Sequence, residues 1–364
     1  MTHILTCVGA RPQFIKAAPV GTALAAREGV RHTLLHTGQH YDANMSDVFF
    51  EELGIAAPDH HLGIGGGPHG AMTGRQLEAI EAVLEQDRPD VLLVYGDTNS
   101  TLAGALAAAK MGIPVAHVEA GLRSHNRAMP EEINRVLTDH VSTWCFAPTQ
   151  DAVRHLAAEG IKEASVHLVG DVMYDAALTF GPRARATSSI LADLGLEGHD
   201  FVLATLHRQE NTDDPERLSA AFAFLRDLAS EGPVILPLHP RTRARLEAMG
   251  GVERYSKGLT LTEPMGYFDI TALLSAARLL VSDSGGMQKE AYFHGRPVAI
   301  LRTETEWVEL IEMGWACLLP PAPLAEMRRG LAALEGGERD HVSAPFGSGN
   351  AADRIVEIIL GRAA

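Results

Sequence analysis

Short apolar runs alternate with helical patterns along most of the chain, and this alternation constrains the fold more than any other feature. In the first half five runs are typical of buried strands: Ile4–Val8, Thr33–His36, Val91–Tyr95, Val115–Val118 and Trp144–Ala147. The segments between them have helical patterns: Phe14–Arg27, Met45–Leu53, Met72–Glu85, Ser100–Lys110 and Glu131–Val141. Such alternation predicts a parallel, doubly wound α/β sheet.

The alternation starts again after residues 166–170. Five further runs predict a second sheet of the same kind: Val202–Leu206, Val234–Leu238, Leu259–Leu261, Leu279–Val281 and Val298–Leu301. A chain of 364 residues is long for one core, which also favours two domains. The most polar segment is Gly181–Asp200, and we place the hinge near Gly170, shortly before it.

Charge and cysteine content exclude several classes of function. The chain has 31 Lys and Arg against 46 Asp and Glu, a net charge of −15, which disfavours a polyanionic partner such as nucleic acid. Its three cysteines are far apart in the sequence and have no zinc-binding spacing. No apolar leader opens the sequence and no apolar run reaches membrane-spanning length, so we expect a cytoplasmic enzyme without a membrane partner.

Residues 279–297 combine a strand, a glycine turn and a helix start. The free N–H groups of the helix start, after Gly285 and Gly286, favour binding of a phosphate, and Ser284 adds a hydroxyl donor. Glu290, about one helical turn further on, is placed to accept hydrogen bonds from ribose hydroxyls. The pattern therefore indicates a nucleotide diphosphate site. A glycine turn that serves only close packing is the alternative.

Two cations follow the first strand. Arg11 and Lys16 lie at and just beyond its carboxyl end, where open α/β sheets bind ligands, and they are placed to hold phosphate oxygens. The segment lacks the Gly-x-Gly-x-x-Gly pattern of a nicotinamide dinucleotide site. Two solvated cations at a helix start are the alternative.

Three carboxylates stand close to strand ends in the first half. Asp97 and Glu119 follow neighbouring predicted strands and should face one crevice, although Asp97 is also placed to cap the helix near Ser100. Glu131 begins a helix and shares a face with Arg135, while Glu132 is expected to point elsewhere. A surface ion pair between Glu131 and Arg135 is the alternative to a catalytic role.

Histidines follow two predicted strands of the second half. His207, with Arg208 beside it, comes after one strand, and His239 comes after the next. A single histidine in this position is usually structural, so only the shared position at strand ends singles out the two. No His-x-x-x-His or Cys-x-x-Cys spacing occurs, and we expect neither a metal nor another cofactor.

These segments resemble, in order and along essentially the whole chain, the non-hydrolysing UDP-N-acetylglucosamine 2-epimerases. Each motif alone is weak, but eight in the family's order are specific. They are Gly-Ala-Arg-Pro-Gln-Phe-Ile-Lys, His-Thr-Gly-Gln-His, Gly-Asp-Thr-Asn-Ser-Thr, His-Val-Glu-Ala-Gly-Leu-Arg-Ser, Pro-Glu-Glu-Ile-Asn-Arg, Leu-His-Arg-Gln-Glu-Asn, Asp-Ser-Gly-Gly and the closing residues 347–355.

The resemblance implies the GT-B architecture, with two Rossmann-like domains around a central cleft. We expect an N-terminal domain of residues 1–169 together with 349–364, because the family's last helix crosses back to that domain, and a UDP-binding domain of residues 170–348. Here the last helix should run over Ala352–Leu360. A homodimer with a role in polysaccharide biosynthesis is the family expectation.

The resemblance also implies the reaction, which is inversion at C2 of a UDP-2-acetamido sugar. The C2 proton is not next to a carbonyl, so elimination of UDP to a 2-acetamidoglucal followed by re-addition is the available route. Asp97, Glu119 and Glu131 match the family's acid/base carboxylates, and His207 matches a histidine near the leaving diphosphate. The sequence leaves open which carboxylate serves which face of C2. The residues that match the UDP contacts are Arg11, Lys16, Ser284, Gly285, Gly286 and Glu290.

The sugar is less constrained than the reaction. Trp307 stands where many family members have an arginine, Met265 replaces a glutamine beside the uracil, and Tyr41–Met45 replaces residues that hold an activating second sugar. These features resemble the branch that acts on UDP-2,3-diacetamido-2,3-dideoxyglucuronic acid. We take UDP-N-acetylglucosamine as the substrate, with that uronic acid as the alternative, and expect no activation by a second UDP-sugar. Three rival functions are a GT-B glycosyltransferase that uses a UDP-sugar, a hydrolysing epimerase and a silent nucleotide-sugar sensor.

Overall fold

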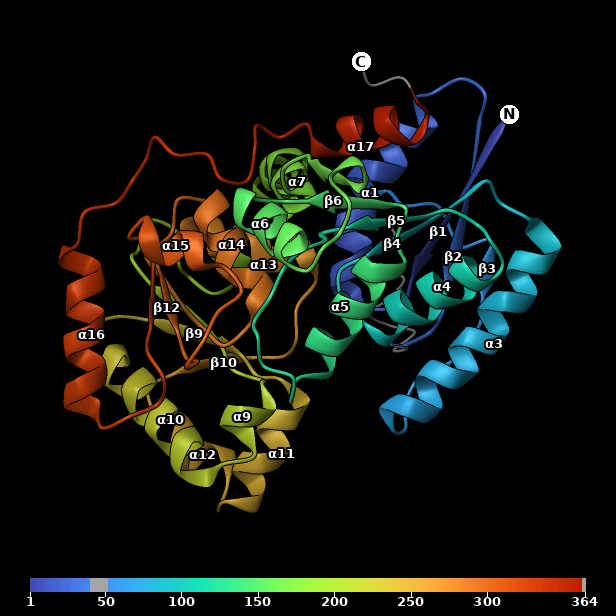
Figure 1. The fold of residues 1–364 in the computed structure, drawn as a ribbon. Helices are drawn as coiled ribbons and strands as arrows, with labels where there is room; N and C mark the ends of the chain where they lie inside the picture. Colours follow the sequence, from blue (N-terminus) through green and yellow to red (C-terminus); the bar gives the residue numbers. More distant parts are fainter. Residues whose placement is uncertain (40–51, 362–364) are drawn as a thin grey trace. The chain divides into compact units, whose positions relative to one another are not determined.

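The computed structural model describes residues 1–39 and 52–361. Within these residues the chain divides into two compact units, Met1–Leu178 with Ala344–Ala364, and Thr179–Ser343. Each unit is built on one parallel sheet (Figure 1). The predicted boundary is at Gly170, whereas the division in the structure falls inside a continuous helix, α7, Val172–Thr187.

The first sheet has the strand order β3-β2-β1-β4-β5-β6-β7, the arrangement of a Rossmann-like fold. Its strands are β1 (Thr2–Val8), β2 (Val30–His36), β3 (His60–His61), β4 (Val91–Tyr95), β5 (Val115–Val118), β6 (Trp144–Ala147) and β7 (Val166–Leu168). The helical segments of this unit besides α7 are α1 (Arg11–Ala25), α3 (His69–Asp87), α4 (Asn99–Lys110), α5 (Pro130–Val141), α6 (Gln150–Ala158), the 3-10 turn η1 (Glu163–Ser165) and α17 (Ala351–Ile359).

The second sheet repeats the arrangement in the order β10-β9-β8-β11-β12-β13. Its strands are β8 (Val202–Thr205), β9 (Val234–Pro237), β10 (Thr260–Thr262), β11 (Leu279–Ser282), β12 (Val298–Ile300) and β13 (Ala316–Leu318). The helices are α8 (Ile190–Asp193), α9 (Gln209–Thr212), α10 (Pro215–Ala229), α11 (Pro240–Ala248), α12 (Val252–Ser256), α13 (Tyr267–Ala276), α14 (Gly285–Phe293), α15 (Val308–Glu312) and α16 (Leu324–Gly336). The predicted fold class, two Rossmann-like parallel sheets, is confirmed.

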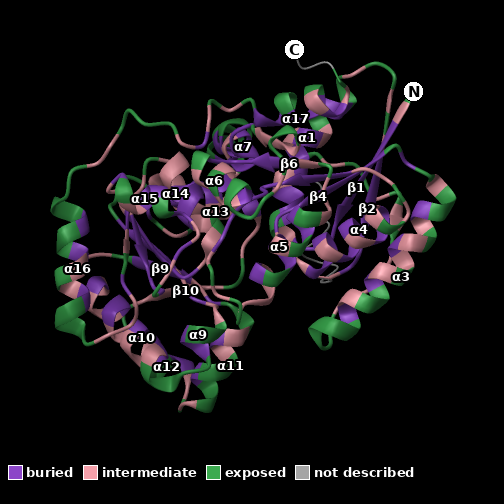
Figure 2. Cartoon of the chain, viewed as in Figure 1, coloured by how far each residue is buried: buried purple, intermediate pink, exposed green. Residues whose placement is uncertain are grey.

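The central strands are buried on both faces because helices cover them (Figure 2). In the first unit Ile80 and Leu84 of α3 pack with the alanines of α4 against β1 and β4. In the second unit Phe222 and Leu225 of α10 pack against β8, β9 and β11. Burial of these apolar side chains stabilises each unit by about 25 cal/mol per Å² of apolar surface removed from water.

The last helix, α17, packs beside α1 in the first unit (Figure 1). Its apolar face is buried through residues such as Ile355 and Val356. The carboxylate of Asp175, in α7, accepts hydrogen bonds from the backbone N–H groups of Ala351 (3.2 Å) and Ala352 (2.7 Å). These contacts satisfy the start of α17 and attach the early part of α7 to the first unit, which explains why the division falls after Leu178.

Two predictions made for the 40–51 region cannot be compared with the structure. The segment Tyr41–Met45 lies outside the described residues, as does most of the helix predicted over Met45–Leu53. In the described part of the chain no helix is long and apolar enough to cross a membrane.

Candidate active site

The carboxyl ends of β1, β4 and β5 bring the predicted groups of the first unit to one edge of its sheet. These strands are neighbours, and β1 and β4 mark the point where the strand order reverses, the usual ligand-binding position in such sheets. Arg11 begins the helix after β1, Asp97 follows β4, and Glu119 follows β5. Asp97 and Glu119 therefore follow neighbouring strands at one edge of the sheet.

Lys16 and Glu119 form an ion pair at this edge. Their side chains are 12% and 6% exposed, so the pair is largely removed from solvent. Gly96 leaves room for it: a Cβ there would lie 3.2 Å from Lys16 Nζ and 3.3 Å from Glu119 Oε2, and its φ of +62° suits glycine. Lys16 therefore neutralises a candidate acid/base carboxylate, a contact that the sequence did not predict.

Arg135 holds Asp97 in place. Its guanidinium donates to Asp97 Oδ2, with Nε at 3.1 Å, and Asn134 Nδ2 donates to the Asp97 carbonyl at 3.0 Å. Thr98 is the residue that caps α4, by accepting from the N–H of Thr101. The alternative in which Asp97 is merely a helix cap is therefore wrong, and the carboxylate remains 28% exposed.

The two glutamates at the start of α5 have different environments. Glu132 is buried and accepts from Ser124 N (2.9 Å), Ser124 Oγ (3.0 Å) and His125 N (3.0 Å), and it also binds Arg135 at 3.1 Å. The expectation that Glu132 points away from the face of Glu131 and Arg135 is wrong, because Glu132 binds Arg135 and also fixes the turn before α5. Glu131 is half-buried and projects from the first turn of the same helix.

Gln13 joins the ends of β1 and β4, a function that the sequence analysis missed. Its Oε1 accepts from the N–H groups of Gly9 (2.7 Å) and Ala10 (2.9 Å), and its Nε2 donates to the carbonyl of Tyr95 (2.8 Å). It lies one turn before Lys16 on α1. The turn that presents Arg11 is thus fixed to the strand that presents Asp97.

In the second unit, Asp283 organises the ends of β8 and β11. It is fully buried and accepts from His207 N (3.0 Å), Arg208 N (2.9 Å) and Asn211 Nδ2 (3.1 Å). Its Oδ1 also lies 3.3 Å from His207 Nδ1. These strands again mark the reversal of strand order, so His207 and Ser284 lie at a ligand-binding position.

The environment of His207 favours its neutral form. Burial lowers its pKa, the nearby carboxylate of Asp283 opposes this, and Arg208 and Arg241 add to the lowering. Nδ1 of the ring lies 3.3 Å from Asp283 Oδ1, so Nε2 is the ring nitrogen left to meet a ligand. His239 is close, with its ring centre 5.5 Å from that of His207, and it caps α11 by accepting from Arg241 N.

The glycine turn opens α14 as predicted. Ser284 is its N-cap and Gly285 and Gly286 form its first turn, while Ser282 Oγ accepts from Ser284 N at 2.9 Å. A Cβ at Gly286 would meet no atom within 4 Å, so the space beside the helix start is open. Glu290 follows about one turn later, largely buried.

Trp307 contacts the backbone of this turn. Its indole N–H donates to the Gly285 carbonyl at 3.0 Å, and Lys289 Nζ lies 4.3 Å from its ring centre. Two arginines lie near the turn. Arg302 is fully buried, and its Nη1 donates to Glu306 Oε2 at 3.0 Å. Nη2 of Arg208 lies 3.6 Å from the position that a Cβ at Gly285 would occupy. Trp307 therefore packs against the glycine turn and holds its backbone.

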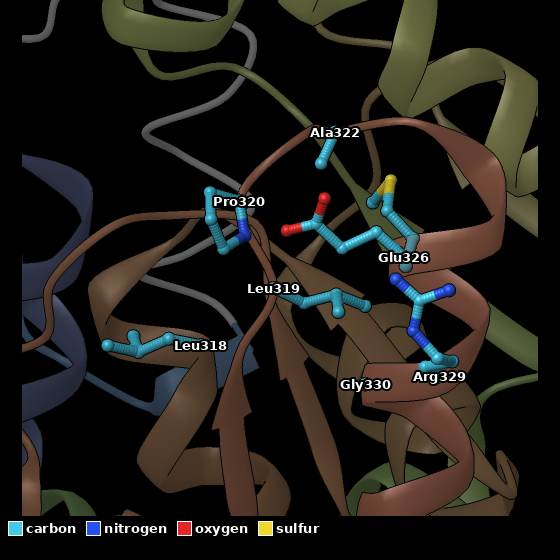
Figure 3. A pocket seen from close by; sticks show the side chains of 8 residues that line it. Leu318, Leu319, Pro320, Ala322, Glu326, Arg329 and Gly330 are labelled. Carbon is cyan, nitrogen blue, oxygen red and sulfur yellow. The ribbon is translucent and has the colours of Figure 1, made fainter.

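A pocket of about 340 Å³ lies elsewhere in the second unit, between β13 and α16 (Figure 3). Leu319, Glu326 and Arg329 are among its lining residues. None of the predicted site residues lines it. Among the described residues, no group of three or more His, Cys, Asp or Glu side chains is placed to hold a metal ion.

A sequence model of the UDP-N-acetylglucosamine 2-epimerases matches residues 22–360. The chain belongs to this family. It is 49% identical over 360 residues to a UDP-2,3-diacetamido-2,3-dideoxy-D-glucuronate 2-epimerase of Pseudomonas aeruginosa, covering 98% of this chain and 99% of that protein. It is 40% identical over 367 residues to a UDP-N-acetylglucosamine 2-epimerase of Methanococcus maripaludis, covering 99% of both.

The fold is also similar to that of solved epimerases. The crystal structure of the Methanocaldococcus jannaschii UDP-GlcNAc 2-epimerase in complex with UDP-GlcNAc and UDP has a TM-score of 0.92 to this chain and 39% sequence identity, and the match covers 99% of this chain and 100% of that one. Members of the family are isomerases, so the prediction of an epimerase rather than a glycosyltransferase is confirmed.

The residues whose contacts in the site were not predicted share one property. Gln13, Arg135 and Asp283 contact backbone or charged groups of a neighbouring strand end and are at most 4% exposed. A buried polar residue directly after a strand, such as Asp283, is a signal that could have been used, because an uncompensated charge there would be costly.

Proposed function

We propose that this epimerase inverts C2 of a UDP-2-acetamido sugar, converting UDP-N-acetylglucosamine to UDP-N-acetylmannosamine reversibly. The observation that carries the proposal is the pair of carboxylates, Asp97 and Glu119, at the ends of adjacent strands of the first unit, each bound to a cation. The relative from M. jannaschii, whose structure contains UDP-GlcNAc and UDP, supports the nucleotide sugar.

The reaction proceeds by elimination and re-addition. A carboxylate base takes the proton from C2, the C2–H electrons form the C1–C2 double bond, and UDP leaves C1 with the bonding pair. A proton then returns to C2 from the other face, and UDP adds back to C1. Asp97, Glu119 and Glu131 are the acid/base groups of this proposal, since two faces of C2 must be served.

In the first unit, Arg11 and Lys16 are the proposed diphosphate contacts. In the second unit, the start of α14 is the proposed contact. The N–H groups after Ser284 and the open side of Gly286 favour an anion, and the charge on departing UDP increases during elimination. His207, whose Nδ1 faces Asp283, is assigned to the leaving diphosphate, to which Nε2 donates a hydrogen bond once the ring is protonated. Glu290 is assigned to the ribose.

One observation favours a second substrate, UDP-2,3-diacetamido-2,3-dideoxyglucuronic acid. The relative named for this sugar is 49% identical to the chain, against 40% for the M. maripaludis enzyme named for UDP-N-acetylglucosamine. Trp307 is consistent with that branch because it occupies the arginine position without adding a cation. The same C2 inversion applies to either sugar.

We further propose a cytoplasmic homodimer that acts in polysaccharide biosynthesis. The three free cysteines suit a reducing compartment, and two of them are fully buried. The dimer rests on the family resemblance and is tested by sedimentation equilibrium.

Initial rates with each purified sugar test the proposed function. We expect epimer formation, a hyperbolic dependence on substrate concentration, and unchanged rates with a strong chelator and without nicotinamide. A sigmoidal curve with UDP-N-acetylglucosamine would contradict the absence of activation by a second sugar. A rate confined to the uronic acid would make that sugar the substrate, and no epimer from either sugar would refute the proposal.

A further inference from the structure

His117 lies in β5 with no exposed surface, and both nitrogens of its ring have a partner. Nε2 is 2.7 Å from the carbonyl oxygen of Gly96, and Nδ1 is 2.7 Å from Oδ1 of Asp139 on α5. No mechanistic step proposed above uses this histidine. Its two contacts nevertheless join the β4 and β5 strand ends to the helix that carries Glu131.

The partners of the ring fix its protonation state. The Gly96 carbonyl only accepts hydrogen bonds, so Nε2 must carry a proton. Asp139 is ionised, since its Oδ2 accepts from Gly121 N (3.1 Å) and binds Arg123 (2.8 Å). Burial alone would raise the pKa of Asp139, but the charges and hydrogen bonds of His117 and Arg123 outweigh it and hold that pKa below its usual value. Nδ1 therefore also carries a proton, and the ring is an imidazolium.

The imidazolium belongs to a cluster of charged groups. Arg123 binds Asp139 and donates two hydrogen bonds of 2.7 Å to the carboxylate of Glu159, which is 29% exposed and also lies 3.5 Å from His140 Nε2. A buried ion cluster is weak as a source of stability, because desolvation offsets most of the attraction. Such a cluster is better explained by the geometry that it imposes.

That geometry concerns the three segments that bear the carboxylates. His117 fixes the peptide between Gly96 and Asp97, where Gly96 has φ +62°. Asp139 fixes the N–H of Gly121, which closes the turn after Glu119. Glu119 has φ +70°, a left-handed conformation that costs a non-glycine residue about 1 kcal/mol or more and persists only where surrounding contacts hold it.

We propose that His117 is a positioning residue, a constitutive imidazolium whose two N–H groups lock the Asp97 and Glu119 segments against α5 for proton transfer at C2. This inference rests on the proposed function for its kinetic part. Its structural part, a doubly protonated buried ring, stands by itself.

Nitrogen-15 NMR of the wild-type enzyme with labelled histidine tests the structural part. The ring of His117, assigned through its own backbone resonances, should show protons on both nitrogens at pH 7.5. A ring with a single proton would overturn the proposal, whether or not any variant folds and whether or not the enzyme epimerises the sugars tested.

Kinetics of His117→Gln test the positioning. The variant loses the ring that joins Gly96 to Asp139, so the catalytic carboxylates should be misplaced and kcat should fall about a hundredfold. KM and the Kd for UDP should change less than about threefold. The control is His3→Gln, which removes a buried histidine of the same sheet that binds Thr33 at 2.8 Å, at the amino end of β1. It should lower the Tm and leave kcat unchanged.

A folded His117→Gln enzyme with normal UDP affinity and near-normal kcat would overturn the inference. An inactive wild type would instead refute the proposed function, and the NMR measurement would then decide the structural part alone.

Discussion

Lys16 is paired with Glu119, so a cation expected at the diphosphate neutralises a carboxylate expected to transfer protons. The pairing gives Lys16 a part in the chemical step, because it sets the charge around the carboxylate that follows β5. In Lys16→Met this carboxylate would be left largely buried without its cation. We expect kcat to fall about a hundredfold, measured as epimer formation.

The same variant reports on the diphosphate. If Lys16 also contacts UDP as proposed, the Kd for UDP should rise about tenfold in isothermal titration. Unchanged kcat in Lys16→Met would contradict the role given to the ion pair. An unchanged Kd for UDP would show that Lys16 does not contact the diphosphate.

Glu131 and Glu132 provide a matched pair of substitutions. Glu131→Gln should reduce turnover at least about a hundredfold with a nearly unchanged Tm, since the substitution removes an acid/base group but keeps the shape of the side chain. Glu132→Gln should lower the free energy of unfolding by about 1–3 kcal/mol. The substitution replaces the carboxylate that accepts hydrogen bonds from Ser124, His125 and Arg135 with a neutral amide. Normal turnover in Glu131→Gln would contradict a catalytic role for Glu131 and favour the alternative, an ion pair with Arg135.

Gly286 tests the anion site at the start of α14. Alanine fits the free protein, because no atom lies within 4 Å of the added Cβ, so the Tm should not fall. The methyl group would project into the space proposed for the diphosphate, and UDP affinity should fall at least about tenfold. The control is Gly74→Ala in α3, also in open space, which should leave UDP binding unchanged. Tight UDP binding by Gly286→Ala would place the diphosphate elsewhere.

His294 should make the enzyme sensitive to acid. Burial lowers its pKa from 6.5 to about 4, and Arg185 and Arg296 add to the lowering. The unfolded chain therefore binds the proton more readily, so this residue lowers the stability as pH falls from about 6.5 to about 4. Between pH 7.5 and 5.0 the wild type should lose on the order of 2 kcal/mol more than His294→Gln in urea unfolding. Equal losses would show that His294 titrates normally in the folded enzyme.

The sequence predicted the central strands closely, for physical reasons. The bounds of β4, β5 and β6 agree with the predicted runs, because strands buried on both faces are uninterrupted apolar segments. The edge strands β3 and β13 were not predicted. β3 has only two residues, both histidine, and β13 has three, too few to show a pattern.

Helix α7 was missed because local signals opposed it. Gly181 and Pro182 are typical helix breakers, yet the helix continues through them, with Phe180 and Ala184 buried on its inner face. Tertiary packing outweighed the local preference there. For the same reason the predicted hinge near Gly170 lies before the point at which the chain divides.

The candidate site was predictable in position but not in contacts. Parallel strands end at one edge of the sheet, so residues that follow β1, β4 and β5 could be grouped from the sequence alone. The pairing of Arg135 with Asp97, across 38 residues, depends on how α5 packs against α4, which periodicity does not specify. Helix spacing alone suggests an ion pair between Arg135 and Glu131. The structure adds Asp97 and Glu132 as partners of Arg135.

The most direct test of the account is the fate of the C2 hydrogen. The wild-type enzyme is incubated with UDP-N-acetylglucosamine in D₂O, and in parallel with the diacetamido uronic acid, and the C2 signal is followed by proton NMR. Elimination and re-addition predict that each epimer formed carries deuterium from the solvent at C2, and that the recovered substrate becomes labelled as well. An epimer that keeps its original hydrogen at C2 would contradict the mechanism.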